Sequence, residues 1–332
     1  MKKIILLITC LLLTGCYNYN EIEKTAIIDA ISIDYENNLY EVTFEVIKNN
    51  DLDTLNLKAI YESGSGSNLI EAFYNVEKKL DNNPLFSHLS LIIINDEIIK
   101  DHFDDIRDFI LRNPKINNNI YLMGSFNKAS DILKNNSLNE ITSDAIKGLI
   151  NNQYNNYVNN LSFNKIVNDD ISNGILSVIN YLDVNNHAYY FNGFGIIKNN
   201  HHFNSDDTKI YNILTNNVTN IVISNNDDII RINKANTKYD FKNHEINIKL
   251  DIELASIKND FNLKTFNNLI TSKITQFYEN IKKDNLDILG INQKYYQRYG
   301  KKKDYFKNEA FNINVKLTVL KNGLIYEVKN ET

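Results

Sequence analysis

Apolar and polar residues alternate with a period of two in stretches near both ends of the chain. Near the beginning, alternation runs over residues 27–33 and resumes over 40–46, on either side of Glu36-Asn37-Asn38. Period two indicates a half-buried strand, and this tripeptide has a turn composition, so we predict a β-hairpin. Further strands are predicted at 89–94, 120–124, 194–197, 221–224, 229–239, 245–255, 313–319 and, after a turn at Asn322-Gly323, 324–328.

Apolar residues spaced three and four apart predict helices between these strands. The first helix follows Ser67, its expected N-cap, and presents Leu69, Phe73, Val76 and Leu80 on one face. A second helix, over about 103–110, should end at Asn113-Pro114, because a residue before proline disfavours helix. The longest apolar stripe predicts a helix over about 263–283. Shorter helices are predicted at 207–214 and, within a weakly patterned region at 138–181, at 141–157 and 162–168.

Strands grouped in hairpins, with helices between them, predict a multi-domain α+β fold of mixed and antiparallel sheets with packed helices. A chain of 332 residues, 43% hydrophobic, is long enough to bury the cores of several such domains. There is no regular strand–helix alternation of the kind that would favour a Rossmann-like sheet. We predict a signal peptide at 1–15, a tether at 16–24, an N-terminal α+β region at 25–187 with room for two subdomains, and a C-terminal α+β domain at 188–330.

The first sixteen residues have the pattern of a bacterial lipoprotein export signal. Met1-Lys2-Lys3 is basic, and the apolar run that follows, 4–13, is too short to span a bilayer, which takes about 20 residues. Leu13-Thr14-Gly15-Cys16 then resembles a lipobox, whose cysteine receives a diacylglyceryl group before the preceding bond is cut. We expect cleavage between Gly15 and Cys16 and attachment to membrane lipid through Cys16. A short membrane helix with a chance cysteine is the alternative.

Charge and cysteine content narrow the possible partners and chemistry. The net charge is -5, and removal of Lys2 and Lys3 with the signal leaves 34 basic against 41 acidic residues, or -7. This balance argues against nucleic acid and against a polybasic membrane contact, both of which need clustered Lys and Arg. Cys10 would leave with the signal, and the sulfur of Cys16 would be consumed by the lipid. No thiol would then remain for a disulfide, a zinc site or a nucleophile.

Few residues are candidates for other chemistry. The six histidines include no His-Glu-x-x-His, and His201 and His202 would point to opposite faces of a strand, so no metal site is expected. The run Gly64-Ser65-Gly66-Ser67 could bind an anion before a helix, but it lacks the P-loop lysine, and a flexible turn is favoured. We expect a structural hydrogen bond from His88, and a carboxylate partner or helix-end role for Arg112. No catalytic, cofactor-binding or metal-binding residue is predicted, and no enzyme activity.

Six short segments follow one another in a recognisable order along the chain. They are Cys16-Tyr17-Asn18-Tyr19-Asn20-Glu21-Ile22, Ile31-Ser32-Ile33-Asp34, Gly66-Ser67-Asn68-Leu69-Ile70-Glu71-Ala72, Leu85-Phe86-Ser87-His88, Leu111-Arg112-Asn113-Pro114-Lys115-Ile116 and Asp287-Ile288-Leu289-Gly290. Behind the lipobox, these segments resemble those of the Ger(x)C spore germination lipoproteins, the C subunits of nutrient germinant receptors. Two departures keep an aromatic residue: Tyr17 and Phe306 stand where the family commonly has Trp, which this chain lacks entirely.

The resemblance implies a lipid-anchored accessory subunit on the outer face of the spore inner membrane. Its implied partners are the integral membrane A and B subunits of the receptor, and its implied fold is several α+β domains without enzymatic activity or cofactor. One alternative is a lipid-anchored solute-binding protein of a transporter, which would have two βαβ-rich lobes around an aromatic-lined cleft. A third class, an anchored hydrolase, would need a nucleophile elbow, metal motif or triad spacing that the sequence does not display.

Overall fold

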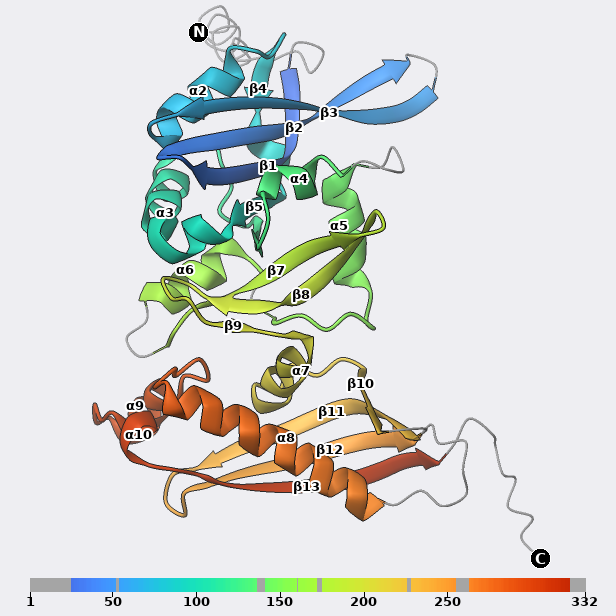
Figure 1. The fold of residues 1–332 in the computed structure, drawn as a ribbon, viewed down its shortest axis with the longest axis vertical. Helices are drawn as coiled ribbons and strands as arrows, with labels where there is room; N and C mark the ends of the chain where they lie inside the picture. The colour runs from blue at the N-terminus through green and yellow to red at the C-terminus, as the bar shows by residue number, and fades with distance from the viewer. Residues whose placement is uncertain are drawn as a thin grey trace, which may run out of the picture.

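The computed structural model describes residues 25–51, 54–135, 141–159, 161–171, 175–225, 228–254 and 263–322. These residues form two β-sheets with packed helices, and the sheets occupy opposite ends of an elongated molecule (Figure 1). The predicted α+β class with mixed and antiparallel sheets is confirmed. The predicted signal peptide, tether and final strand at 324–328 lie outside the described residues.

The first sheet has nine strands among the described residues and a parallel centre. In spatial order its strands are β3 (Thr54–Gly66), β2 (Leu39–Asp51), β1 (Thr25–Glu36), β5 (Leu91–Asn95), β6 (Tyr121–Ser125), β7 (Val178–Asn185), β8 (Ala188–Ile196) and β9 (His202–Phe203), while β4 (Asn83–Leu85) pairs with the start of β1. Pairing is parallel from β1 through β5 and β6 to β7 and antiparallel in the rest of this order. Hairpin patterns in the sequence locate only the antiparallel parts, so the mixed sheet was predicted but the position of its parallel strands was not.

Helices cover both faces of this parallel centre. On one face the core contains residues of α2 (Leu69–Glu77), the 3-10 turn η2 (Phe86–His88), the π-helical turn η3 (Ile98–His102), α3 (Phe103–Arg112) and α6 (Phe163–Ile171); on the other it contains α4 (Ala129–Leu133) and α5 (Thr142–Asn151). Strand β5 sends Ile92 and Ile94 into the first core and Leu91 and Ile93 into the second. A strand buried on both faces must be continuously apolar, which explains the run Leu-Ile-Ile-Ile.

Local sequence signals determine several element ends. Asn37 and Asn38 both have positive φ, 52° and 63°, which gives the two-residue turn that the β1–β2 hairpin needs, as predicted. Helix α3 ends directly before Asn113-Pro114, also as predicted. The predicted N-cap of α2 is wrong by one residue. The Asn68 side chain accepts the Glu71 backbone N–H at 3.0 Å, whereas Ser67 donates to the Glu71 carboxylate.

The run Gly64-Ser65-Gly66 is not the flexible turn that the sequence suggested. Gly64 and Gly66 are the last part of strand β3, and α2 returns along them at very close range. A Cβ on Gly66 would lie 2.5 Å from the backbone nitrogen of Ala72, and one on Gly64 would lie 2.6 Å from that of Val76. These glycines therefore allow a helix to pack against a strand.

The second sheet has four strands among the described residues, β10 (Ile221–Asn225), β11 (Asp228–Asp240), β12 (Glu245–Leu254) and β13 (Asn312–Asn322). Its core includes the apolar stripe of α8 (Leu263–Lys283), in which Phe266, Ile270, Ile274 and Ile281 are buried as predicted. The described residues of this half also form three shorter helices, α7 (Ser205–Leu214), α9 (Ile291–Tyr299) and α10 (Tyr305–Asn308). Strand β13 pairs in parallel with β12.

The two halves share one hydrophobic core where the chain passes between them. Phe194 and Ile196 of β8 belong to the same cluster as α7 and α8, and the Leu176 N–H donates to the carbonyl of Asp287. The predicted division after residue 187 falls in the turn between β7 and β8, which pair with each other in the first sheet. Within the described residues, no helix is both long enough and apolar enough to cross a membrane.

Candidate functional site

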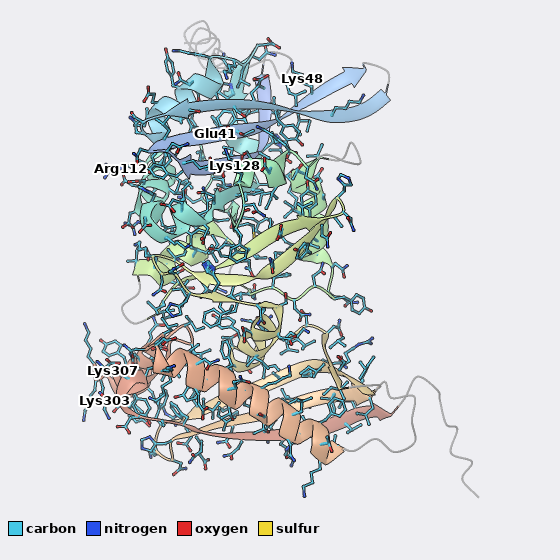
Figure 2. All side chains as sticks on the ribbon, in the orientation of Figure 1. Glu41, Lys48, Arg112, Lys128, Lys303 and Lys307 are labelled. Carbon is cyan, nitrogen blue, oxygen red and sulfur yellow. The ribbon has the colours of Figure 1, made fainter. Side chains whose placement is uncertain are left out.

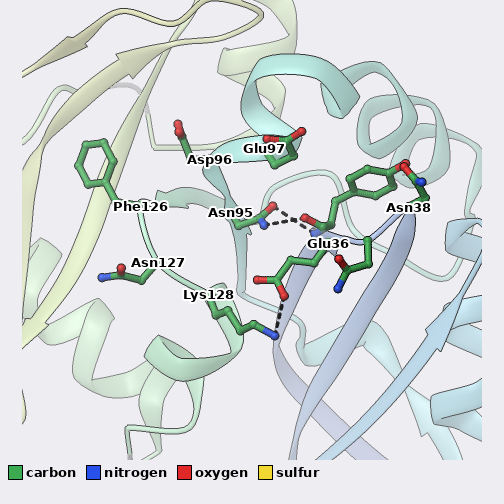
Figure 3. Close-up of a pocket in the computed structure, with 10 residues that line it drawn as sticks. Glu36, Asn38, Asn95, Asp96, Glu97, Phe126, Asn127 and Lys128 are labelled. Atoms are coloured by element: carbon green, nitrogen blue, oxygen red, sulfur yellow. Dashed lines mark hydrogen bonds and ion pairs between the residues drawn. The ribbon is translucent and has the colours of Figure 1, made fainter.

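A hollow of about 660 Å³ opens beyond the carboxyl ends of three parallel strands, β1, β5 and β6. In open parallel sheets, ligands bind outside these ends where the connections of neighbouring strands diverge. Here β1 leads to β2 on one side and β5 leads through α3 to β6 on the other, so the hollow lies at such a point. Ten residues line it: Tyr35, Glu36, Asn37, Asn38, Asn95, Asp96, Glu97, Phe126, Asn127 and Lys128 (Figure 3).

Asn95 holds the floor of the hollow together. Its side-chain nitrogen donates to the Tyr35 carbonyl at 3.2 Å, and its oxygen accepts the N–H groups of Tyr35 and Ile98, each at 3.3 Å (Figure 3). One amide thus links the ends of β1 and β5 and the turn that follows β5. Since its oxygen accepts two N–H groups and its nitrogen donates to a carbonyl, the Asn95 side chain holds the floor of the hollow in place.

The charges at the rim are unevenly balanced. Lys128 pairs with Glu36 at 2.8 Å and lies 3.7 Å from Glu41, and the bond with Glu36 raises the pKa of its ammonium. Asp96 and Glu97 also line the hollow, so its walls carry three carboxylates and one ammonium. A lining with both hydrogen-bond acceptors, the carboxylates, and a donor, the ammonium, suits a small polar molecule. Among the described residues, no group of three or more His, Cys, Asp and Glu could hold a metal ion.

A cluster around Asp96 continues from the hollow into the sheet. The Tyr181 hydroxyl donates to Asp96 at 2.6 Å, Lys100 pairs with it at 2.5 Å, and His202 Nε2 lies 3.4 Å away. Burial raises the pKa of Tyr181 and lowers that of His202. A tyrosine held in its protonated form donates a hydrogen bond and does not act as a base, so Tyr181 fixes the Asp96 carboxylate beside the strand ends.

Two buried carboxylates hold helices onto the first sheet. Asp34, at the end of β1, accepts the N–H groups of Ala129 and Ser130 at the start of α4, at 2.6 and 3.0 Å. Glu45 of β2 accepts those of Thr142 and Ser143 at the start of α5, at 2.7 and 3.2 Å. Each carboxylate therefore caps a helix that is distant in sequence. Burial raises the pKa of both carboxyl groups against the lowering effect of these hydrogen bonds.

A third buried carboxylate, Asp287, caps a helix start in the second half of the molecule. Asp287 accepts the N–H groups of Ile291 and Asn292, at 2.7 and 2.8 Å, at the start of α9. Gly290, directly before α9, has φ +63°, which lies in the left-handed region that glycine adopts readily. Asp34 and Asp287 both lie in segments that resemble the germination family, and in this protein both are structural residues.

The sequence-predicted site residues do not converge in the structure. Gly15 and Cys16 lie outside the described residues. His88 is exposed, and its side chain makes no hydrogen bond within the described part of the chain, so the structural bond expected for it is not found. Arg112 pairs with Asp108 at 2.6 Å, as predicted. His201 and His202 contact different carboxylates, Asp284 and Asp96.

Sequence reasoning missed the cluster around Asp96. Its members come from three separate segments, since Asp96 and Lys100 lie four residues apart while Tyr181 and His202 belong to other strands, and no sequence spacing connects the three segments. A signal was nevertheless present in two strand glycines, because a glycine inside a strand marks close approach of another group. A Cβ on Gly195 would lie 2.7 Å from the Tyr181 ring, and one on Gly124 would lie 3.3 Å from it.

Comparison with known proteins assigns the chain to a family. Residues 18–184 match the family described as spore germination protein N-terminal domain, and residues 192–323 match the one described as spore germination B3/GerAC like, C-terminal. The putative spore germination protein YfkR of Bacillus subtilis (strain 168) is 27% identical over 158 residues, which cover 45% of this chain and 41% of that protein. The match therefore spans less than half of the relative's length.

One solved structure is also similar to this chain. The crystal structure of the GerBC protein covers 87% of this chain and 96% of its own, at 15% identity and a TM-score of 0.49. The two family matches are matches of sequence, and together they cover both halves of the described structure. This chain belongs to the GerAC-like family of spore germination proteins.

Proposed function

We propose that this protein is a lipid-anchored accessory subunit of a nutrient germinant receptor, held on the outer face of the spore inner membrane. It acts by associating with the integral membrane A and B subunits and not by catalysis. Membership of the GerAC-like family supports the role in germination. The lipobox-like Leu13-Thr14-Gly15-Cys16 is the observation that supports the anchor.

The anchor would act by concentrating the folded body beside its partners. Two acyl chains give stable attachment where one gives only marginal binding. Residues 17–24 separate Cys16 from the start of β1, and eight extended residues reach at most about 26 to 29 Å. A body confined so closely meets membrane subunits at a high effective concentration, so even a weak contact becomes occupied.

Removing the lipidated sulfur tests this function. We expect Cys16→Ala to lose attachment to the spore inner membrane, to fail to co-purify with the A and B subunits, and to reduce nutrient-triggered germination. Cys10→Ala is the matched control, because it removes the other cysteine of the chain from within the signal. A Cys16→Ala protein that assembles and supports germination like wild type would contradict the anchoring role.

The solute-binding alternative receives no support from the comparisons, since both family descriptions name spore germination. The hollow at the strand ends is compatible with a ligand, but the side chain of Asn95, one of its lining residues, already bonds the backbone groups of Tyr35 and Ile98. We therefore keep association with membrane subunits as the proposed function.

A further inference from the structure

The folded body begins at one end of the long molecule. Thr25, its first described residue, pairs with Asn83 of β4, and Ile27 pairs with Ile47 of β2. Helix α2 and strand β4 lie at this end, and the second sheet lies at the other (Figure 1). A tether attached to Thr25 therefore brings this end of the body, and not the second sheet, closest to the lipid.

Four lysines lie on the strand pair and the helix end beside the point where the chain enters the body, and one of them, Lys79, donates to the Ser63 carbonyl of β3. Lys48 and Lys58 are directly opposite each other on β2 and β3, and Lys78 and Lys79 follow the end of α2. Lys48 also pairs with Asp81, at 3.1 Å, which brings the connection after α2 beside this strand pair. We call Lys48, Lys58, Lys78 and Lys79 the lysine cluster; Figure 2 labels Lys48 at this end.

The lysine cluster is unusual in an acidic protein. Like charges directly opposite each other on neighbouring strands destabilise a sheet, and only Lys48 of this pair has an ion-pair partner within the described chain. Glu77 is the last residue of α2, Asp81 lies in the connection after it and Glu71 is exposed in the first turn of α2, so the four positive charges stand beside three negative ones. The chain as a whole has a net charge of -5. The net charge of the whole chain, which argued against a polybasic membrane contact, does not reveal this local excess of lysine.

The outer face of α2 adds exposed apolar groups to these charges. Ile70 is 74% exposed and Tyr74 is 55% exposed, one helical turn apart, while Leu69, Phe73 and Val76 are buried on the opposite face. The Lys78 ammonium lies 4.1 Å from the centre of the Tyr74 ring. An aromatic ring with a lysine above it suits a membrane interface, where the ring meets the acyl boundary and the ammonium meets headgroups.

We propose that the outer face of α2 and the lysine cluster rest on an anionic lipid surface. The inference rests on the proposed function, because the lipid on Cys16 is what confines this end of the body to the bilayer. Two observations favour lipid as the binding partner of this surface: the lysines are complementary in charge to anionic headgroups, and the short tether keeps this end of the body near the bilayer. Each lysine near an anionic surface strengthens attraction about fivefold, and a tethered body needs only a weak contact to hold one orientation.

A single tryptophan can report this contact, because the chain contains none. The lipidated protein is reconstituted in vesicles of phosphatidylcholine, with or without phosphatidylglycerol, whose acyl chains are brominated to quench indole fluorescence. We expect Tyr74→Trp to be quenched at least twofold more with phosphatidylglycerol than without, and this difference to shrink at high salt. Tyr296→Trp, 46% exposed on α9 in the other half, is the matched control and should show no such difference.

Charge variants test the role of the lysine cluster. Lys58→Ser, Lys78→Ser and Lys79→Ser combined should abolish the lipid-dependent difference at Tyr74→Trp. The control combines Lys301→Ser, Lys302→Ser and Lys303→Ser, which remove the same charge from the opposite end, where Figure 2 labels Lys303. That control should leave the difference unchanged. Ile70→Trp gives the same readout if Tyr74→Trp does not fold.

The outcomes separate this inference from the function on which it rests. Flotation of the wild-type protein with vesicles is measured first, and failure to float overturns both the anchor and the orientation. Flotation without preferential quenching at position 74 overturns the orientation alone. Stronger quenching of Tyr296→Trp, or loss of the difference in the Lys301 to Lys303 control, would also overturn it, since the far end would then be the one that meets lipid.

Discussion

Exchanging Gly66 for alanine measures how closely α2 packs on β3. The added Cβ would lie 2.5 Å from the Ala72 backbone nitrogen and 2.8 Å from the Glu71 Cβ, whereas real Cβ contacts stay beyond 3.0 Å. Backbone atoms cannot rotate out of the way, so the helix must move from the strand. Overpacking of this kind costs about 1–3 kcal/mol. We expect Gly66→Ala to lower the free energy of unfolding by that amount.

The same chemical change at Gly148 supplies the control. Gly148 lies in α5, where an added Cβ would meet nothing within 4 Å. Alanine favours a helix interior over glycine by roughly 0.8–1.0 kcal/mol, so Gly148→Ala should stabilise the protein. Urea unfolding followed by circular dichroism would show midpoints that shift in opposite directions with equal slopes. The packing argument would be refuted if Gly66→Ala unfolded at the wild-type midpoint or above it.

Two further predictions concern ionisable groups that are buried or partly buried. Asp287→Ala leaves the N–H groups of Ile291 and Asn292 without their acceptor, so thermal unfolding should show a loss of about 1–3 kcal/mol, with Asp287→Asn less affected. Burial lowers the pKa of His202 below 6.5, and Lys100 reinforces this shift while Asp96 opposes it. Just below pH 6.5, His202 is therefore more protonated in the unfolded chain than in the folded protein. Wild type should therefore lose stability as pH falls from 6.5, and His202→Phe should lose less; identical pH profiles by urea titration would rule out this role.

The elements that the sequence predicted well are those fixed by local spacing. The β1–β2 hairpin follows from alternation around Asn37 and Asn38, which adopt positive φ with little strain. The end of α3 follows from Pro114, and α8 follows from an apolar stripe of several turns that needs no knowledge of the rest of the chain. Each of these signals acts within a few residues, so it can be recognised before the fold is known.

The elements that it missed depend on distant neighbours. Strand β3 ends in glycines that indicate a turn when only adjacent residues are considered, and their meaning appears once α2 lies on them. Strand β7 contains Tyr181, whose hydroxyl partner, Asp96, is 85 residues away. The hollow combines three separate strand ends, so no local pattern could indicate it. Long-range pairing decides these features, and one sequence does not reveal it.

The buried carboxylates show which part of the family resemblance concerns folding. Asp34 accepts a hydrogen bond from Ala129 at the start of α4, 95 positions later in the sequence, and Asp287 fixes the start of α9. Both side chains are enclosed, so a partner protein could not touch them without unfolding a helix end. Substitutions there test stability. Contacts with membrane or partner subunits must instead involve exposed side chains, such as Ile70 and Tyr74 on α2, where a change can alter association while the two sheets stay intact.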